Sequence, residues 1–187
     1  MNVKTLTTLL VAVCAAVPAA AGPYSADELL AWLGSDDAGQ RALARQMIVY
    51  EDAAVVPRVV RLLGDERPEV SWAAQRVLED FASMYTDARN PEGRRAVADA
   101  LMTLVAPEQP PALKKTGLRL LPWVLPDDYD VTPVAALLED PELKEKARVA
   151  LRDAGTPPAN RALCGALDGA EPAFQAALLF ALEQNAC

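Results

Sequence analysis

Histidine is absent from this 187-residue chain, and aromatic residues make up only 5% of it. Without an imidazole, a protein cannot form a Ser-His-Asp triad, a Cys-His pair or a histidine-liganded zinc site. The nine glycines are scattered singly, so there is no glycine-rich loop to hold a phosphate. We therefore expect no enzyme active site, no cofactor and no metal centre. The apolar content is mainly Ala, Leu and Val, a composition that favours helices over sheets.

Positive charge is also scarce, because 18 Lys and Arg residues face 26 Asp and Glu residues and the net charge is −8. A chain this acidic lacks the cationic field that nucleic-acid binding relies on, so we expect no nucleic-acid partner. The acidic run at residues 127–130 resembles half of a calcium loop, but it lacks the glycine and the closing glutamate. A solvated loop in which Asp130 or Thr132 caps the next helix is the favoured interpretation.

The first 21 residues are typical of a secretory signal peptide. A basic start at Met1–Lys4 precedes an apolar run at Thr5–Val17, and the small residues Ala19–Ala21 follow. We predict cleavage after Ala21, which leaves residues 22–187 as the mature domain. The mature protein is then secreted or periplasmic and has no membrane insertion.

Two other uses of the N-terminal segment compete with cleavage. A retained membrane anchor would need a continuous apolar helix, which Pro18 and the Gly22-Pro23 pair disfavour. Lipidation at Cys14 would need Gly, Ala or Ser before the cysteine, and Val13 stands there instead.

Cys164 and Cys187 are the two cysteines beyond this segment, and an oxidising compartment makes a disulfide between them the first expectation. If residues 159–168 and 171–184 form a helix pair, Cys164 lies about 8 Å from the turn and a helical Cys187 about 25 Å from it. A disulfide needs Cα atoms within about 7 Å, so the last residues would have to leave the helix. The alternative is that Cys164 is a small core residue.

Apolar residues recur at helical spacing through the rest of the chain. Ser25 and Glu28 form a capping-box motif ahead of Leu29 and Leu30, which predicts a helix start. No segment keeps the two-residue alternation of a strand, so the pattern predicts an all-α fold. Between residues 107 and 126, five prolines interrupt the pattern and predict an irregular helix.

The helical pattern also repeats along the chain. Residues 59–65 with 68–78 match residues 134–140 with 141–151, apart from two extra residues before Pro68. The last leucine of each first helix recurs about every 30 to 40 residues, which fits one helix pair per repeat. Five repeats are predicted, at residues 25–50, 52–84, 91–125, 127–154 and 157–186.

These repeats, with Leu-Leu-x-Asp, a proline-containing turn and Val/Leu-x-x-x-Ala-x-x-x-Leu, resemble HEAT repeats, in particular the short bacterial kind related to bilin lyases. The likeness is clear over 52–82 and 127–154, and weak over 90–125. A basic residue usually follows the opening apolar residue of the second helix; Lys144 fits this rule, and Ser71 departs from it. The resemblance implies a right-handed α-solenoid of about five stacked helical hairpins, of the armadillo type.

The same resemblance implies a non-catalytic scaffold that binds another protein on its concave face, which second helices normally line. An enzyme accessory similar to bilin-lyase subunits and an envelope-tethered structural protein are the alternatives. The candidate partner-binding residues are spaced about one helical turn apart on predicted second helices: Arg41, Arg45, Trp72, Arg76, Lys144 and Arg148. In the competing interpretation Trp72 packs between helices, and the cations pair with Glu69 and Glu145. We assign Trp32 and Trp123 to the core.

Overall fold

A computed structural model describes residues 23–87 and 89–185 of the chain. This part is all-helical, with ten α-helices, three 3-10 helices and no strand, so the predicted all-α class is confirmed. The predicted signal peptide at residues 1–21, Cys14 and Cys187 lie outside the described residues. The helices are α1 (Ala26–Leu33), α2 (Ala38–Ile48), η1 (Ala53–Val55), α3 (Val56–Leu62), α4 (Pro68–Met84), α5 (Pro91–Met102), η2 (Thr103–Val105), α6 (Pro111–Val124), α7 (Thr132–Ala136), η3 (Leu137–Glu139), α8 (Lys144–Ala154), α9 (Pro157–Gly165) and α10 (Pro172–Gln184).

Local sequence signals set several helix ends. The Ser25 hydroxyl accepts a hydrogen bond from the Glu28 N–H at 3.3 Å, and the Glu28 carboxylate accepts one from the Ser25 N–H at 2.8 Å. This reciprocal pair is the predicted capping box, and the hydrogen bond from the Ser25 N–H lowers the pKa of Glu28. At the other end of the chain, Gly155 ends α8 with a φ of 62°, a left-handed conformation that glycine adopts without strain.

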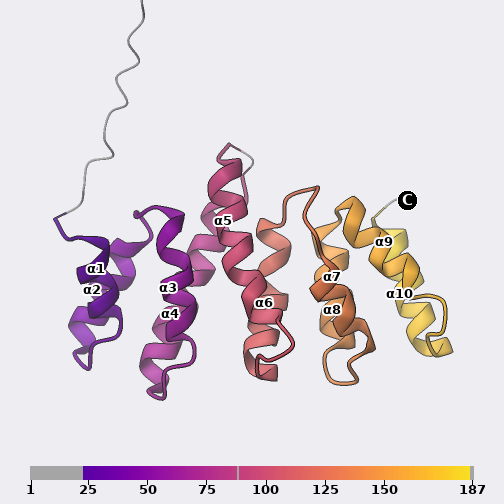
Figure 1. The fold of residues 1–187 in the computed structure, drawn as a ribbon, viewed down its shortest axis with the longest axis horizontal. Coiled ribbons are helices and arrows are strands. Elements are labelled where there is room, and N and C mark those ends of the chain that lie inside the picture. Colours follow the sequence, from indigo (N-terminus) through magenta and orange to yellow (C-terminus); the bar gives the residue numbers. More distant parts are fainter. Residues whose placement is uncertain (1–22, 88, 186–187) are drawn as a thin grey trace, which may run out of the picture.

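The helices come in pairs that lie side by side in a row, from α1 and α2 at one end to α9 and α10 at the other (Figure 1). We call α1, α3, α5, α7 and α9 the first-helix layer, and α2, α4, α6, α8 and α10 the second-helix layer. In the second-helix layer each helix packs against the next one along the chain. Ala74 and Ala147 are fully buried there, and their small side chains allow the helix axes to approach closely.

The buried residues form one cluster that extends from Leu29 in α1 to Leu182 in α10. It consists mainly of Leu, Val and Ala, and Phe81 is its largest fully buried side chain. Thr156 is the one buried polar residue among those described, and its hydroxyl caps α9. None of the helices in the described part of the chain is both long enough and apolar enough to cross a membrane.

The proline-rich stretch folds into a continuous helix rather than the irregular one that its sequence predicts. Pro111 opens α6, where the missing N–H would have no intrahelical partner. Pro122 lies close to the end of α6, so the helix loses one backbone hydrogen bond and continues to Val124. The Arg94 guanidinium then donates hydrogen bonds to the carbonyls of Val124 and Leu125, which α6 leaves without helical partners.

Candidate functional site

An exposed tryptophan marks the second-helix layer near the N-terminal end of the row. Trp72 on α4 is 57% exposed, so it does not pack between helices. The Arg45 guanidinium of α2 lies 5.7 Å from the centre of the Trp72 ring, a cation–π contact that orients both side chains. The two residues form a surface that combines a large apolar area with a positive charge.

Next to Trp72, an ion-pair cluster joins α4 to α6. The Glu79 carboxylate pairs with Arg76 of its own helix and, at 2.7 Å, with Arg119 of α6, and it accepts a hydrogen bond from Gln75 at 3.2 Å. Burial of Glu79 by itself raises its pKa. The hydrogen bonds from Arg119 and Gln75 and the two arginine charges outweigh this effect and hold the pKa below its ordinary value. Glu79 is therefore ionised at neutral pH and holds both guanidinium groups on this face.

A groove of about 550 Å³ follows the cluster, with walls formed by α4, α6 and α8. We call it the α4–α8 groove. The buried Leu118 and Ala150 form part of its apolar lining, and Trp123 contributes to it while remaining 45% exposed. The assignment of Trp123 to the core is thus wrong, because α6 turns this side chain toward the surface. The lining residues are Gln75, Lys115, Thr116, Leu118, Arg119, Pro122, Trp123, Glu145, Lys146, Val149, Ala150 and Asp153.

Most charges that line this groove are paired within the protein. Glu145 pairs with Arg148 at 3.0 Å, and Asp153 pairs with Arg152 at 2.7 Å. The two lysines differ, since within residues 23–87 and 89–185 neither Lys115 nor Lys146 forms an ion pair or a side-chain hydrogen bond. The α4–α8 groove therefore presents two positive charges that no internal partner neutralises.

Two other candidate cations, Arg41 and Arg148, form hydrogen bonds within the protein. Arg41 donates a hydrogen bond to the Ser35 carbonyl at 2.7 Å. Arg148 pairs with Glu145 and reaches the Ala177 carbonyl of α10 at 3.4 Å. The structure thus brings Arg45, Trp72 and Arg76 together, whereas the remaining three candidates, Arg41, Lys144 and Arg148, lie elsewhere.

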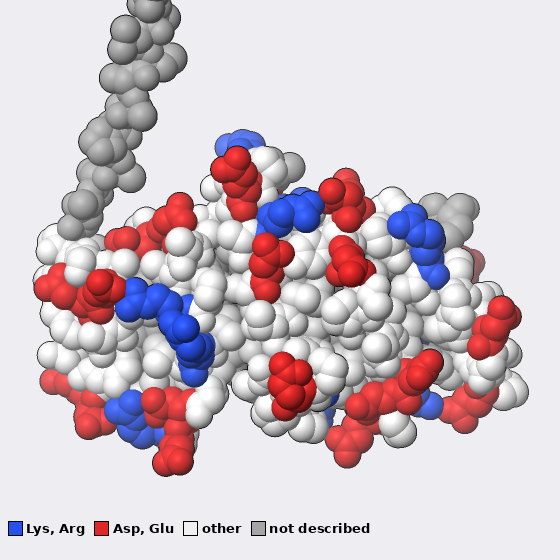
Figure 2. Space-filling view, in the orientation of Figure 1, with Lys and Arg blue, Asp and Glu red and all other residues white. Residues whose placement is uncertain are grey.

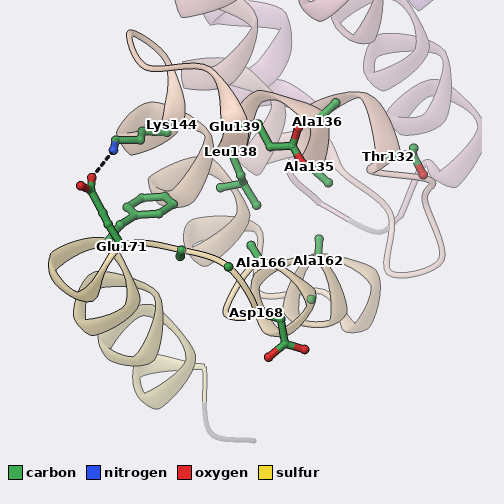
Figure 3. A pocket seen from close by; sticks show the side chains of 14 residues that line it. Thr132, Ala135, Ala136, Leu138, Glu139, Lys144, Ala162, Ala166, Asp168 and Glu171 are labelled. Carbon is green, nitrogen blue, oxygen red and sulfur yellow. Dashed lines mark hydrogen bonds and ion pairs between the residues drawn. The ribbon is translucent and has the colours of Figure 1, made fainter.

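Lys144 borders a second, larger groove of about 900 Å³ between α7, α8, α9 and α10 (Figure 3). Its ammonium pairs with Glu171 at 2.6 Å and lies 5.1 Å from the centre of the Phe174 ring. Asp168 lies well away from this pair in the same view, beyond the alanines that line the groove. We call this the alanine-lined groove; its one cation is already paired, and the carboxylates around it exceed the cations.

Several other sequence expectations concern single side chains. Trp32 is partly buried against the core, and its ring meets Tyr24 edge to face at 4.8 Å. Cys164 is exposed on α9, so its interpretation as a core residue is wrong, and its pairing with Cys187 stays a prediction. The Asp130 carboxylate accepts hydrogen bonds from the N–H and the hydroxyl of Thr132, at 2.9 and 2.6 Å, at the start of α7.

The described residues hold no group of three or more carboxylates or thiols that could ligate a metal ion. On the face shown in Figure 2, acidic and basic side chains are interspersed, acidic ones predominate along the lower right edge, and the centre is largely uncharged. No large area of a single charge sign covers that face.

Four residues that line the α4–α8 groove were not identified from the sequence: Lys115, Arg119, Trp123 and Lys146. Three of them recur at intervals of four residues on α6, a spacing that places them on one helix face. That spacing could have identified them. The leucines beside Trp123 led to its assignment to the core instead.

No protein-family model matches this chain, and no curated protein is similar enough to it to count as a relative. The likeness to HEAT repeats therefore depends on the motifs quoted above. Any function has to be argued from the geometry of the chain itself.

Proposed function

We propose that this protein is an exported, non-catalytic interaction module, a right-handed HEAT-like α-solenoid that binds another protein on its second-helix layer. The row of helix pairs and the continuous packing of second helix on second helix support this architecture. In solenoids each repeat shields the apolar face of its neighbour, and the second helices line the binding surface.

The exposure of Trp72 is the observation on which the proposal depends. An indole that is 57% exposed keeps a large apolar area in water, and burial of that area by a partner would be favourable. Trp and Arg are also the residues that most often dominate binding energies at protein interfaces. Trp72, Arg45 and Arg76 place both types within one small surface.

The helix that carries Trp72 and Arg76 is well packed, which favours recognition of a partner. Trp72 and Arg76 project from the 17-residue helix α4, whose opposite side contributes buried residues from Val70 to Ala82. Side chains on a packed helix keep their positions better than side chains on loops. A partner would therefore meet a preorganised surface and lose less of its binding energy to ordering.

Affinity capture with the purified protein tests the proposal. Trp72→Ala should reduce recovery of a bound envelope protein at least about tenfold, the size of a modest interface hot spot. Tyr50→Ala is the matched control, because Tyr50 is an exposed aromatic residue (79%) outside the second helices. Circular dichroism should be unchanged for both variants. Equal recovery by wild type and Trp72→Ala would defeat the proposal.

Export forms a separate part of the proposal and is supported by the sequence of residues 1–21. Expression of the full chain followed by intact-mass measurement tests it. The product in the extracytoplasmic fraction should begin at Gly22. A chain that retains Met1 and stays in the cytoplasm would contradict export.

A further inference from the structure

We infer that the α4–α8 groove holds an extended peptide segment of the partner in which a large apolar side chain is flanked by aspartate or glutamate. This inference rests on the proposed interaction function and adds the chemistry of the bound segment. It follows from the lining of the groove, the state of its charges and its shape.

The apolar side chain is expected because the groove offers matching surface. Trp123 keeps 45% of its surface exposed beside the half-buried Pro122 and Val149, and Leu118 lies in the lining. A Leu or Phe side chain placed there would remove apolar area from water on both partners. Contact with the indole ring would add to this gain.

The flanking carboxylates are expected because of the two lysines. Lys115 of α6 and Lys146 of α8 line the groove and have no ion-pair partner in the described part of the chain. The other groove charges, Arg119, Glu145 and Asp153, are each paired within the protein. A lysine ammonium on a flexible stem can follow a carboxylate without a fixed geometry. Acidic residues on either side of the apolar anchor therefore complement this groove.

The shape favours a peptide over a compact ligand. The groove spans three helices on the surface, whereas small-molecule sites enclose most of their ligand. Nucleic acid fits poorly, because a net charge of −8 opposes a polyanion and two free lysines offer little compensation. The alanine-lined groove has the opposite character, since its only cation already pairs with Glu171.

Selection from a phage-displayed library of random seven-residue peptides on the full chain tests this inference. Peptides that bind wild type should be enriched in Asp or Glu beside Leu, Phe or Trp. The double variant Lys115→Glu, Lys146→Glu should bind the selected peptides about tenfold more weakly, as expected for two reversed, partly exposed charges. It should select Lys-containing or Arg-containing peptides instead.

The matched control is Arg61→Glu, Arg161→Glu, which makes the same change in net charge. Both of these arginines are exposed, on α3 and α9, and neither forms an ion pair within the described residues. This control should bind the selected peptides as wild type does. Trp123→Ala should remove the preference for a large apolar residue.

Selected peptides without acidic enrichment, or with equal affinity for wild type and the lysine double variant, would overturn the inference. So would dimerisation that Trp123→Ala abolishes, because a second copy of the chain would then occupy the groove. A failure of this inference can be distinguished from a failure of the proposed function. If peptide selection fails while Trp72→Ala still abolishes partner capture, the interaction function stands and only the occupant of the groove is wrong.

Discussion

The two layers of helices differ in length and in packing. The second helices have 11 to 17 residues, whereas the first helices have 5 to 12. All three 3-10 helices adjoin first helices. Grooves of about 750 and 520 Å³ lie along the first-helix layer, at α3 and α5 and near α7, and the alanine-lined groove of about 900 Å³ extends from α7 and α9 to α8 and α10. The first-helix layer is therefore the more loosely packed of the two.

A groove on the surface is not by itself a binding site. Grooves along the first-helix layer are explained by short helices that do not fill the space between neighbours. The α4–α8 groove, of about 550 Å³, lies between long, packed helices, and its lining includes an exposed tryptophan and two lysines without partners among the described residues. Chemistry, rather than volume, distinguishes it.

Shortening a leucine in each layer should give the largest difference. Leu121 of α6 is fully buried, so Leu121→Ala should lower the free energy of unfolding by about 3–5 kcal/mol through lost burial and the cavity that remains. Leu62 of α3 is only partly buried, and Leu62→Ala should cost about 1–2 kcal/mol. Equilibrium urea unfolding followed by circular dichroism measures both. Equal losses would show that Leu62 in α3 is packed as tightly as Leu121 in α6.

Enlarging an alanine should give the next largest effect. Ala147 of α8 is fully buried, so Ala147→Leu should cost about 1–3 kcal/mol, because extra methyl groups have no space between the second helices. Ala135 of α7 lines the alanine-lined groove, and Ala135→Leu should change stability by no more than about 0.5 kcal/mol. Thermal unfolding of the two variants compares them directly. A large loss for Ala135→Leu would mean that the groove closes in solution.

Features set by neighbours in the chain could be predicted from the sequence. The Ser25–Glu28 capping box and the all-α class follow from local motifs and periodicity, and the structure contains both. The continuity of α6 could not be predicted in the same way. Five prolines suggest a broken helix, but Pro107, Pro110 and Pro126 lie outside α6. The helix survives because Pro111 opens it and Pro122 lies near its end.

The candidate site was harder to predict, because its geometry depends on contacts between residues far apart in the sequence. Helical spacing identified Trp72 and Arg76 as neighbours, but it could not show that Glu171 would pair with Lys144 or that Arg148 would reach α10. These partners belong to the following helix pair. Trp123 was misjudged for a similar reason, since its exposure depends on how α6 packs against α4 and α8.

The smallest effect expected is the pH-dependent contribution of Glu79 to the free energy of unfolding. Its carboxylate pairs with Arg76 of α4 and Arg119 of α6 and so connects two second helices at the candidate site. Its pKa in the folded protein lies below the ordinary value of 4.5. The ionised carboxylate therefore stabilises the fold above about pH 4.5, and this stabilisation disappears as the pH falls through the folded-state pKa.

Glu79→Gln should lower the free energy of unfolding by about 1 kcal/mol at pH 7, because the Glu79 side chain is 13% exposed and pairs with two arginines whose side chains are about half exposed. The difference from wild type should shrink as the pH falls through the folded-state pKa of Glu79, because the protonated Glu79 and the glutamine that replaces it in the variant are then both uncharged. Glu183→Gln serves as the control, because Glu183 is exposed on α10 and forms no ion pair within the described residues. A Glu79→Gln deficit that stays constant with pH would show that Glu79 acts through packing. The arginine cluster beside Trp72 would then need another explanation for its position.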